Sequence, residues 1–274
     1  GKSRSRPLEE IVREAEKLVK NNYKEIVLCG ICLGAYGKDL KGGSDLADVV
    51  TAFEKIKGLL RIRLSSIEAL DVTDKLINRM RKSKKLCRHL HIPIQSGDDV
   101  ILSKMNRKFS SGDYLKLIGK LKRIIPGIAI TTDIMVGFPS ERESNFKNTL
   151  ALIKKIVPLR VHIFNYSKRG GTNACNFKGE VGTLIKKERA RRLQTISEAC
   201  SLQFRKRFLG QTMKVLFEKK EHGYWLGHTD NYINCRIQSG RDLKNMLSPV
   251  KLKKINSGYI DCDFPCQTKK RSVK

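Results

Sequence analysis

Short apolar runs alternate with amphipathic stretches through the first 182 residues. The apolar runs cover residues 25–30, 60–66, 89–94, 128–136 and 160–166. Helical periodicity predicts helices at 7–20, 45–57, 72–82, 98–105, 111–124 and 141–156. Strands that alternate with helices form parallel sheets, because a parallel neighbour needs a long crossover connection. We therefore expect an α/β fold, as a parallel sheet or partial barrel, with its functional site beyond the carboxyl ends of the strands.

The periodicity changes in the last third of the chain. The helical spacing of apolar residues over 183–209 predicts one long basic helix, with Leu184, Leu193, Cys200 and Phe204 on its apolar face. After it the period falls to two, which predicts strands at 212–218, 224–228, 232–237, 247–255 and 259–264. We expect four segments: an α/β core at 1–182, a linker helix at 183–209, a small all-β, OB-like barrel at 210–266 and a basic tail at 267–274.

Positive charge dominates the composition. Lys and Arg number 56 against 27 Asp and Glu, a formal net charge of +29. Such an excess favours a polyanionic partner, because contacts with phosphates release counterions, and RNA is the first candidate. A lysine-rich solvated surface is the alternative, and a membrane partner is not expected. The predicted RNA contacts are cations on the long helix and aromatic residues of the barrel: Arg189, Arg191, Arg192, Arg205, Lys206, Tyr224, Trp225 and Tyr232.

Eight cysteines are too few and too scattered for a disulfide scaffold in a chain this long, so we expect reduced thiols in a cytoplasmic protein. Cys29 and Cys32 form a lone CxxC at a strand end. His89 and His91 could complete a metal site with them, but ordinary buried thiols are the favoured interpretation. Cys262 and Cys266 have Lys269 where a CxxxCxxC needs a third thiol, so no metal ligand set is predicted.

Polar residues and glycines follow the predicted strands. Ser65, Ser66 and Glu68 come just past one strand, where a carboxylate suits a ribose hydroxyl or an ammonium group; capping of the next helix is the alternative. Gln95 follows the strand that contains both histidines. Residues 137–141 follow a further strand, and the plainer interpretation is a turn that places Glu141 and Glu143 in the first turn of a helix.

Six segments together carry a family resemblance: GKSRSRPLEEIV, EIVLCGICLGAYGKDL, RIRLSSIEALDVTDKLI, HLHIPIQSGDDVILSKMNR, ITTDIMVGFPSERESNF and FNYSKRGGTNA. They resemble, in order, the radical S-adenosylmethionine (SAM) methylthiotransferases, and the terminal barrel resembles their RNA-binding TRAM domain. The RLSSIE stretch resembles the branch that modifies N6-threonylcarbamoyladenosine in tRNA. The alternatives are the branches acting on isopentenyladenosine in tRNA or on a ribosomal protein.

The resemblance implies a partial radical-SAM (β/α) barrel and an enzyme with SAM and two 4Fe-4S clusters as cofactors. In this family a 5′-deoxyadenosyl radical removes the hydrogen at C2 of an adenosine beside the anticodon, and sulfur and a methyl group are added there. The substrate is then the tRNA anticodon stem-loop; the electron donor and the sulfur source are unidentified. The positions matching SAM contacts are Gly30, Ser65, Ser66, Glu68, Gln95, Val136 and Gly137. No catalytic side chain is assigned.

The sequence departs from the family pattern at its start. The family's CxxxCxxC precedes an Arg-Ser-Arg-Pro-like stretch, which here is Arg4–Pro7, and an N-terminal domain precedes both. We therefore expect this chain alone to be inactive and poorly stable, with an unpaired sheet edge. A catalytically inactive RNA-binding remnant is the alternative. Smaller departures are Ser140 in place of Gly, three positions that usually hold Pro, and two unusual cysteines: Asn165, Lys168, Gly170, Cys29 and Cys32.

Overall fold

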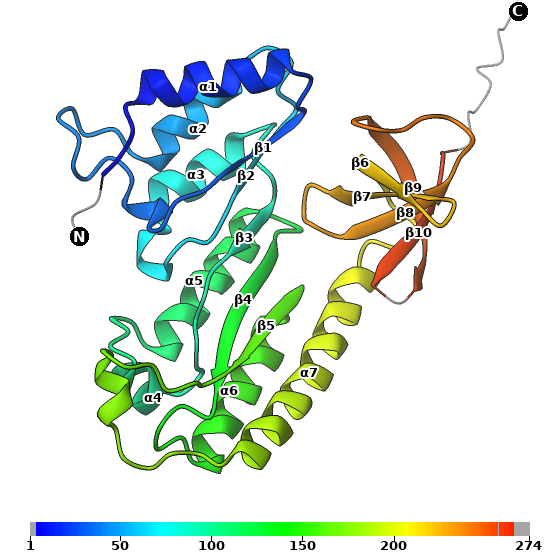
Figure 1. Ribbon diagram of the computed structural model, residues 1–274. Coiled ribbons are helices and arrows are strands. Elements are labelled where there is room, and N and C mark those ends of the chain that lie inside the picture. The colour runs from blue at the N-terminus through cyan, green and yellow to red at the C-terminus, as the bar shows by residue number, and fades with distance from the viewer. Residues whose placement is uncertain (1–3, 257, 266–274) are drawn as a thin grey trace, which may run out of the picture. The chain divides into compact units, whose positions relative to one another are not determined.

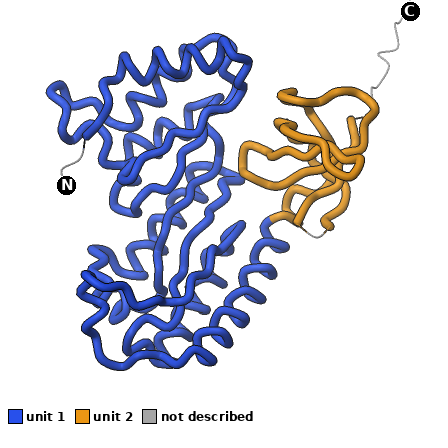
Figure 2. Tube along the Cα trace, in the orientation of Figure 1, with its two compact units in different colours: residues 1–204 blue, residues 205–274 orange. Residues whose placement is uncertain are grey.

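The computed structural model describes residues 4–256 and 258–265. The chain divides into two compact units, residues 1–204 and 205–274, which Figure 2 colours separately. The predicted tail at 267–274 and the residues Cys266 and Lys269 lie outside the described residues. Among the helices of the described residues, none is long and apolar enough to cross a membrane.

The first unit alternates helices and strands as predicted (Figure 1). Its strands are β1 (Glu25–Leu28), β2 (Arg61–Leu64), β3 (His89–His91), β4 (Ala129–Val136) and β5 (Arg160–Asn165). Its helices are α1 (Leu8–Lys20), α2 (Leu46–Glu54), α3 (Asp74–Lys82), α4 (Asp99–Lys104), α5 (Ser111–Ile124), α6 (Glu143–Ile156) and α7 (Thr183–Lys206). Short 3₁₀ turns occur at Leu33–Ala35, Ala69–Asp71 and Asn173–Asn176. The predicted α/β class is confirmed.

All strand pairs of the first unit are parallel. β1 pairs with β2, and β3, β4 and β5 form a second ladder. Single parallel bridges, Ile62 to Leu86 and Ser66 to His91, connect the two ladders. Within the part of the chain that the structure describes, the outer edge of β1 has no partner strand, and Val27 on it is 48% exposed. This is the open edge that the sequence predicts.

Side-chain caps set where several of the helices begin. Asp45 and Ser110 form capping boxes at the starts of α2 and α5, each with an Asp three residues on. The Thr73 hydroxyl accepts the Leu76 N–H at the start of α3. Asp98 accepts the N–H groups of Val100 and Ile101 at the start of α4. These caps fix the connections that follow the strands.

Helix α7 is part of the first unit over most of its length, rather than a free linker. Its buried residues recur every three or four positions: Lys186, Arg189, Leu193, Ser197, Cys200 and Phe204. Leu193 and Cys200 join the same apolar core as the strands. The Val161 N–H of β5 donates to the Ser197 hydroxyl at 3.2 Å. Leu184, expected on the apolar face, is 81% exposed, because the buried stripe begins only at Lys186.

The second unit is a closed five-stranded barrel, as the period-two pattern predicts. Its strands are β6 (Thr212–Glu221), β7 (Tyr224–Thr229), β8 (Asn234–Gln238), β9 (Leu247–Asn256) and β10 (Tyr259–Asp263), in the order β10-β8-β7-β6-β9. The inward positions of these strands form its core, including Val215, Phe217, Val250, Leu252 and Ile260. Gly227 is required where strands cross closely, because a Cβ there would lie 2.1 Å from the Leu216 carbonyl oxygen.

Candidate functional site at the strand ends

Two hollows open beside the carboxyl ends of the strands in the first unit. One, of about 850 Å³, includes Cys29, Gly30 and Cys32 after β1, and its walls reach α1 and α2. The other, of about 670 Å³, lies past β3 and β4 and is lined by residues that include Gln95, Arg107, Met135, Phe138 and Phe177. The predicted SAM residues therefore divide: Gly30 lines the first hollow and Gln95 lines the second.

Ser65, Ser66 and Glu68 lie between these hollows in the sheet order. The Ser65 N–H donates to the Leu28 carbonyl at 2.9 Å, and Ser66 bridges to His91, so both serines continue the parallel ladder past β2. The Glu68 carboxylate is half-exposed and accepts from Arg107 Nη1 at 2.6 Å. Its side chain makes no capping hydrogen bond, and α3 is capped by Thr73 instead. The capping alternative for Glu68 is therefore wrong.

Gln95 has a left-handed backbone, with φ of 74°. Its N–H donates to the Asp133 carbonyl at 2.8 Å and its own carbonyl accepts from Met135 at 2.9 Å, so β4 holds the strained residue in place. Left-handed non-glycine residues cost energy and concentrate at functional sites. These hydrogen bonds therefore fix the backbone of Gln95, a residue that lines the second hollow.

The turn after Gln95 is pinned to α6. The Gly97 N–H donates to Thr149 Oγ1 at 2.9 Å, and a Cβ at Gly97 would lie 2.6 Å from Thr149 Cα. Asn148 donates to Asp98 at 2.8 Å. Burial would raise the pKa of Asp98, but the hydrogen bonds from Asn148, Asn145 and the α4 amides outweigh it and hold that pKa below its usual value. The carboxylate of Asp98 thus anchors the turn in its charged form.

Val136 and Gly137 end β4 next to a buried ion pair. The Gly137 N–H donates to Glu141 Oε2 at 2.7 Å, and Gly137 has φ of 74°. Glu141 also accepts from Arg189 Nη1 at 2.7 Å, and Arg189 further donates to the Glu141 carbonyl at 3.0 Å. Burial raises the pKa of Glu141 despite these donors. The prediction that Glu141 begins the helix is wrong: α6 starts at Glu143, and Glu141 folds back onto β4.

The predicted RNA-binding cations of α7 lie in different environments. Arg189 is 4% exposed and held by Glu141, so it cannot reach a phosphate, and its predicted role is wrong. Arg191 is exposed and pairs with Glu188, and Arg192 is half-buried against Glu143 at 2.9 Å. Lys206 is exposed and Arg205 is half-buried. Helical phase could have identified Arg189, which lies four residues before Leu193 on the buried stripe.

The aromatic candidates of the barrel also differ in accessibility. The Arg236 guanidinium lies 4.5 Å from the centre of the half-buried Tyr224 ring. Tyr232 is half-buried and stacks on His228, with the ring centres 5.1 Å apart. Trp225 is only 7% exposed, which removes it as a base-stacking platform because its ring belongs to the barrel wall. Two of the three predicted aromatic contacts thus keep accessible surface.

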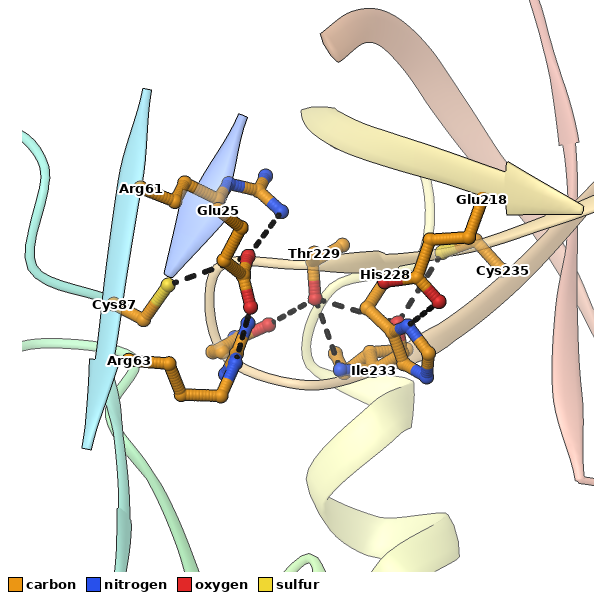
Figure 3. Close-up of polar contacts among 10 residues, drawn as sticks. Glu25, Arg61, Arg63, Cys87, Glu218, His228, Thr229, Ile233 and Cys235 are labelled. Atoms are coloured by element: carbon orange, nitrogen blue, oxygen red, sulfur yellow. Dashed lines mark hydrogen bonds and ion pairs between the residues drawn. The ribbon is translucent and has the colours of Figure 1, made fainter. Parts of the chain in front are cut away.

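The described cysteines do not assemble into a cluster site. Cys29 and Cys32 are exposed beside the first hollow. Cys87 is buried, and its thiol donates to Glu25, which also pairs with Arg61 and Arg63 (Figure 3). Among residues 4–256 and 258–265, only His91, Asp133 and His162 form a group of three or more ligand-type side chains. The described residues therefore do not fit the three-thiolate set that holds a 4Fe-4S cluster.

The chain shares its sequence with known enzymes along nearly its whole length. It is 40% identical over 261 residues to threonylcarbamoyladenosine tRNA methylthiotransferase MtaB of Thermotoga maritima, covering 94% of this chain and 59% of that protein. It is 41% identical over 264 residues to tRNA-2-methylthio-N(6)-dimethylallyladenosine synthase of Acetivibrio thermocellus, covering 95% of this chain and 55% of that protein. The chain thus spans under two-thirds of the length of these relatives.

The fold and the sequence profile agree with these relatives. Coproporphyrinogen III oxidase of Escherichia coli, a radical SAM enzyme, superposes with a TM-score of 0.50 at 12% identity, covering 90% of this chain and 60% of that one. Methylornithine synthase also superposes with a TM-score of 0.50, at 16% identity, over 72% of this chain and 56% of that one. The profile of the radical SAM superfamily matches residues 1–153. By this match and its similarity to the methylthiotransferases, the chain belongs to the radical SAM superfamily, whose members bind SAM and a 4Fe-4S cluster.

Proposed function

We propose that the protein is a tRNA methylthiotransferase, or the part of one that this chain represents. One observation carries the proposal: identity of about 40% to such enzymes extends over 94% of the chain, through the α/β unit and into the small barrel. A radical SAM core alone is compatible with many reactions. A core followed by a basic closed barrel adds a surface for a polyanionic substrate.

We propose N6-threonylcarbamoyladenosine, beside the anticodon, as the nucleoside that is modified. Overall identity does not choose between the branches, since it is 40% to the threonylcarbamoyladenosine enzyme and 41% to the dimethylallyladenosine enzyme. The choice rests on the RLSSIE stretch at residues 63–68, which resembles the first of these branches. Its last residue, Glu68, presents a half-exposed carboxylate beside the second hollow through its pair with Arg107.

SAM would be held along the strand ends. Gly30, Ser65 and Ser66 offer backbone and hydroxyl groups, Glu68 a carboxylate and Gln95 an amide. Val136 and Gly137 offer a strand end at which Gly137 has no Cβ. When bound, SAM supplies a radical precursor and a methyl group. The residues of this chain contribute binding and orientation. Because the described thiols do not form a cluster site, we propose that residues 1–274 alone do not carry out the reaction.

The tRNA would bind through charge and stacking. We propose Arg191, Arg192, Arg205 and Lys206 of the α7 region as phosphate contacts, and Tyr224 and Tyr232 of the barrel as stacking surfaces for unpaired bases. We propose that the barrel acts as a TRAM domain, that the anticodon stem-loop is the bound region, and that the protein works in the cytoplasm. The domain limits proposed for this role are those predicted from the sequence, with the barrel at 210–266.

The test is the nucleoside content of tRNA from a strain that lacks the gene. Mass spectrometry should show loss of the 2-methylthio form of N6-threonylcarbamoyladenosine, with the unmodified nucleoside accumulating. The 2-methylthio form of isopentenyladenosine is the internal control and should be unchanged. Loss of that nucleoside instead would assign the protein to the sister branch. Unchanged levels of both would refute a tRNA substrate and direct attention to ribosomal proteins or to RNA binding without catalysis.

A further inference from the structure

Two imidazoles and a carboxylate meet on one face of the parallel ladder β3-β4-β5. His91 pairs in register with Thr131, and Asp133 pairs with His162, so the side chains of all four share a face. The alternate positions, such as Leu90, Ile130 and Val161, enter the apolar core on the other side. The ligand-type atoms of His91, Asp133 and His162 all lie within 4.8 Å of one another.

Neighbouring hydrogen bonds orient the central imidazole of this group. His91 Nδ1 lies 2.9 Å from Thr131 Oγ1, which turns its Nε2 toward Asp133 Oδ1 at 3.2 Å. The same threonine oxygen lies 3.0 Å from His89 Nε2. A hydroxyl placed between two imidazoles can accept from one and donate to the other. When Thr131 accepts from His91 Nδ1–H, the Nε2 lone pair of His91 is left facing the carboxylate.

In that tautomer a cation must lie between His91 and Asp133, whereas in the other tautomer the His91 Nε2–H donates to Asp133 directly. A lone pair and a carboxylate oxygen 3.2 Å apart repel each other unless a proton or a metal ion lies between them. Ligand atoms around a tetrahedral ion with bonds of about 2.1 Å lie about 3.4 Å apart, close to the observed spacing. His162, on the neighbouring strand, adds a second imidazole within side-chain reach. A shared proton would bind only to His91 and Asp133, whereas a metal ion would also be coordinated by His162.

We propose that His91, Asp133 and His162 form a binding site for a divalent transition-metal ion of the zinc type. Two imidazoles and one carboxylate are the ligand types that such ions take, and three protein ligands leave one position for water or another ligand. Three adjacent hydrogen-bonded strands supply the ligands, so the site is held by the ladder rather than by loops. Thr131 is the outer-shell group that orients His91. The metal site does not depend on the proposed substrate.

The test is titration of the metal-stripped full chain with Co²⁺ alone, followed by visible absorption and metal analysis. The exposed Cys29 and Cys32 would also bind cobalt, so they are replaced by serine in every protein compared. We expect one Co²⁺ per chain with d–d bands and no thiolate charge-transfer band. His162→Gln should weaken binding at least 100-fold, and Thr131→Val about 10-fold, the size of an outer-shell effect. His222→Gln is the control, because this exposed imidazole lies in the turn between β6 and β7.

Circular dichroism of each variant separates lost binding from lost folding. His162 is exposed, so its replacement should leave the spectrum and the unfolding midpoint unchanged. Loss of one bound Co²⁺ in folded His162→Gln, with His222→Gln binding as before, would establish the site. Equal cobalt binding by the parent, His162→Gln and His222→Gln proteins, or no stoichiometric binding by the parent, would overturn it. His91 and Asp133 would then share a proton only.

Discussion

The buried pair of Glu141 and Arg189 predicts a large loss of stability when only one partner is removed. Both side chains are almost fully buried, at 1% and 5% exposure. In Arg189→Met the Glu141 carboxylate loses its Arg189 donor at 2.7 Å and keeps the Gly137 N–H. The Glu141 main-chain carbonyl also loses its Arg189 donor at 3.0 Å. Removing one member of a buried ion pair costs about 3–5 kcal/mol, because the other charge is left uncompensated.

The assay is urea unfolding followed by far-ultraviolet circular dichroism, which reports mainly the helices of the first unit. With a slope of about 2–3 kcal/mol per molar urea, the midpoint should fall by about 1–2.5 M. The single tryptophan, Trp225, lies in the barrel, so its fluorescence reports the second unit separately. Arg191→Met is the matched control on the same helix, since Arg191 pairs with Glu188 in solvent, and its midpoint should not move.

Two further results check the reasoning about charge. The double variant Glu141→Gln with Arg189→Met should recover part of the loss, because no unpaired charge then remains buried. The loss in Arg189→Met should also shrink at lower pH, because the pKa of Glu141 is already raised by burial and its carboxyl can take up a proton. If Arg189→Met unfolds at the same urea concentration as Arg191→Met, the buried pair does not stabilise this end of β4.

Three other predictions concern the strand ends and the RNA surface. In the whole protein, Glu68→Ala should weaken SAM binding about 10- to 100-fold in equilibrium dialysis, whereas Asp74→Ala, which changes an exposed carboxylate on α3, should not; equal affinities would exclude Glu68 from the pocket. The lowered pKa of Asp98 contributes stability that is present above about pH 4 and lost as pH falls through the folded-state value. Asp98→Asn should therefore be less stable near neutrality, and its unfolding midpoint should depend less on pH below about pH 4. A pH dependence of the midpoint parallel to that of the wild type would contradict this. Binding of tRNA should weaken with salt, and Lys206→Gln should reduce the log–log slope by about 0.7–0.9 for one lost phosphate contact; an affinity independent of salt would refute an electrostatic interface.

The sequence predicted the elements well because their periodicities are strong and local. Examples are the apolar run at residues 128–136, which forms β4, and the period-two pattern at residues 224–228, which forms β7. Each strand lies within a few residues of its expected place. Side-chain environments were harder to predict. Arg189 looked like one more surface cation because α7 carries charge on every face, and its partner Glu141 is 48 residues away. The group of His91, Asp133 and His162 depends on strand register, which periodicity does not specify.

The claim that SAM binds along the strand ends is tested most directly by hydrogen–deuterium exchange of the whole protein with and without SAM. We predict slower exchange in three segments when SAM is present: residues 65–68 after β2, residues 95–97 after β3, and residues 136–138 after β4. Peptides from the barrel of the second unit serve as the internal reference and should exchange at the same rate in both states. Protection confined to other segments, or no protection at these three strand ends, would contradict the proposed SAM site.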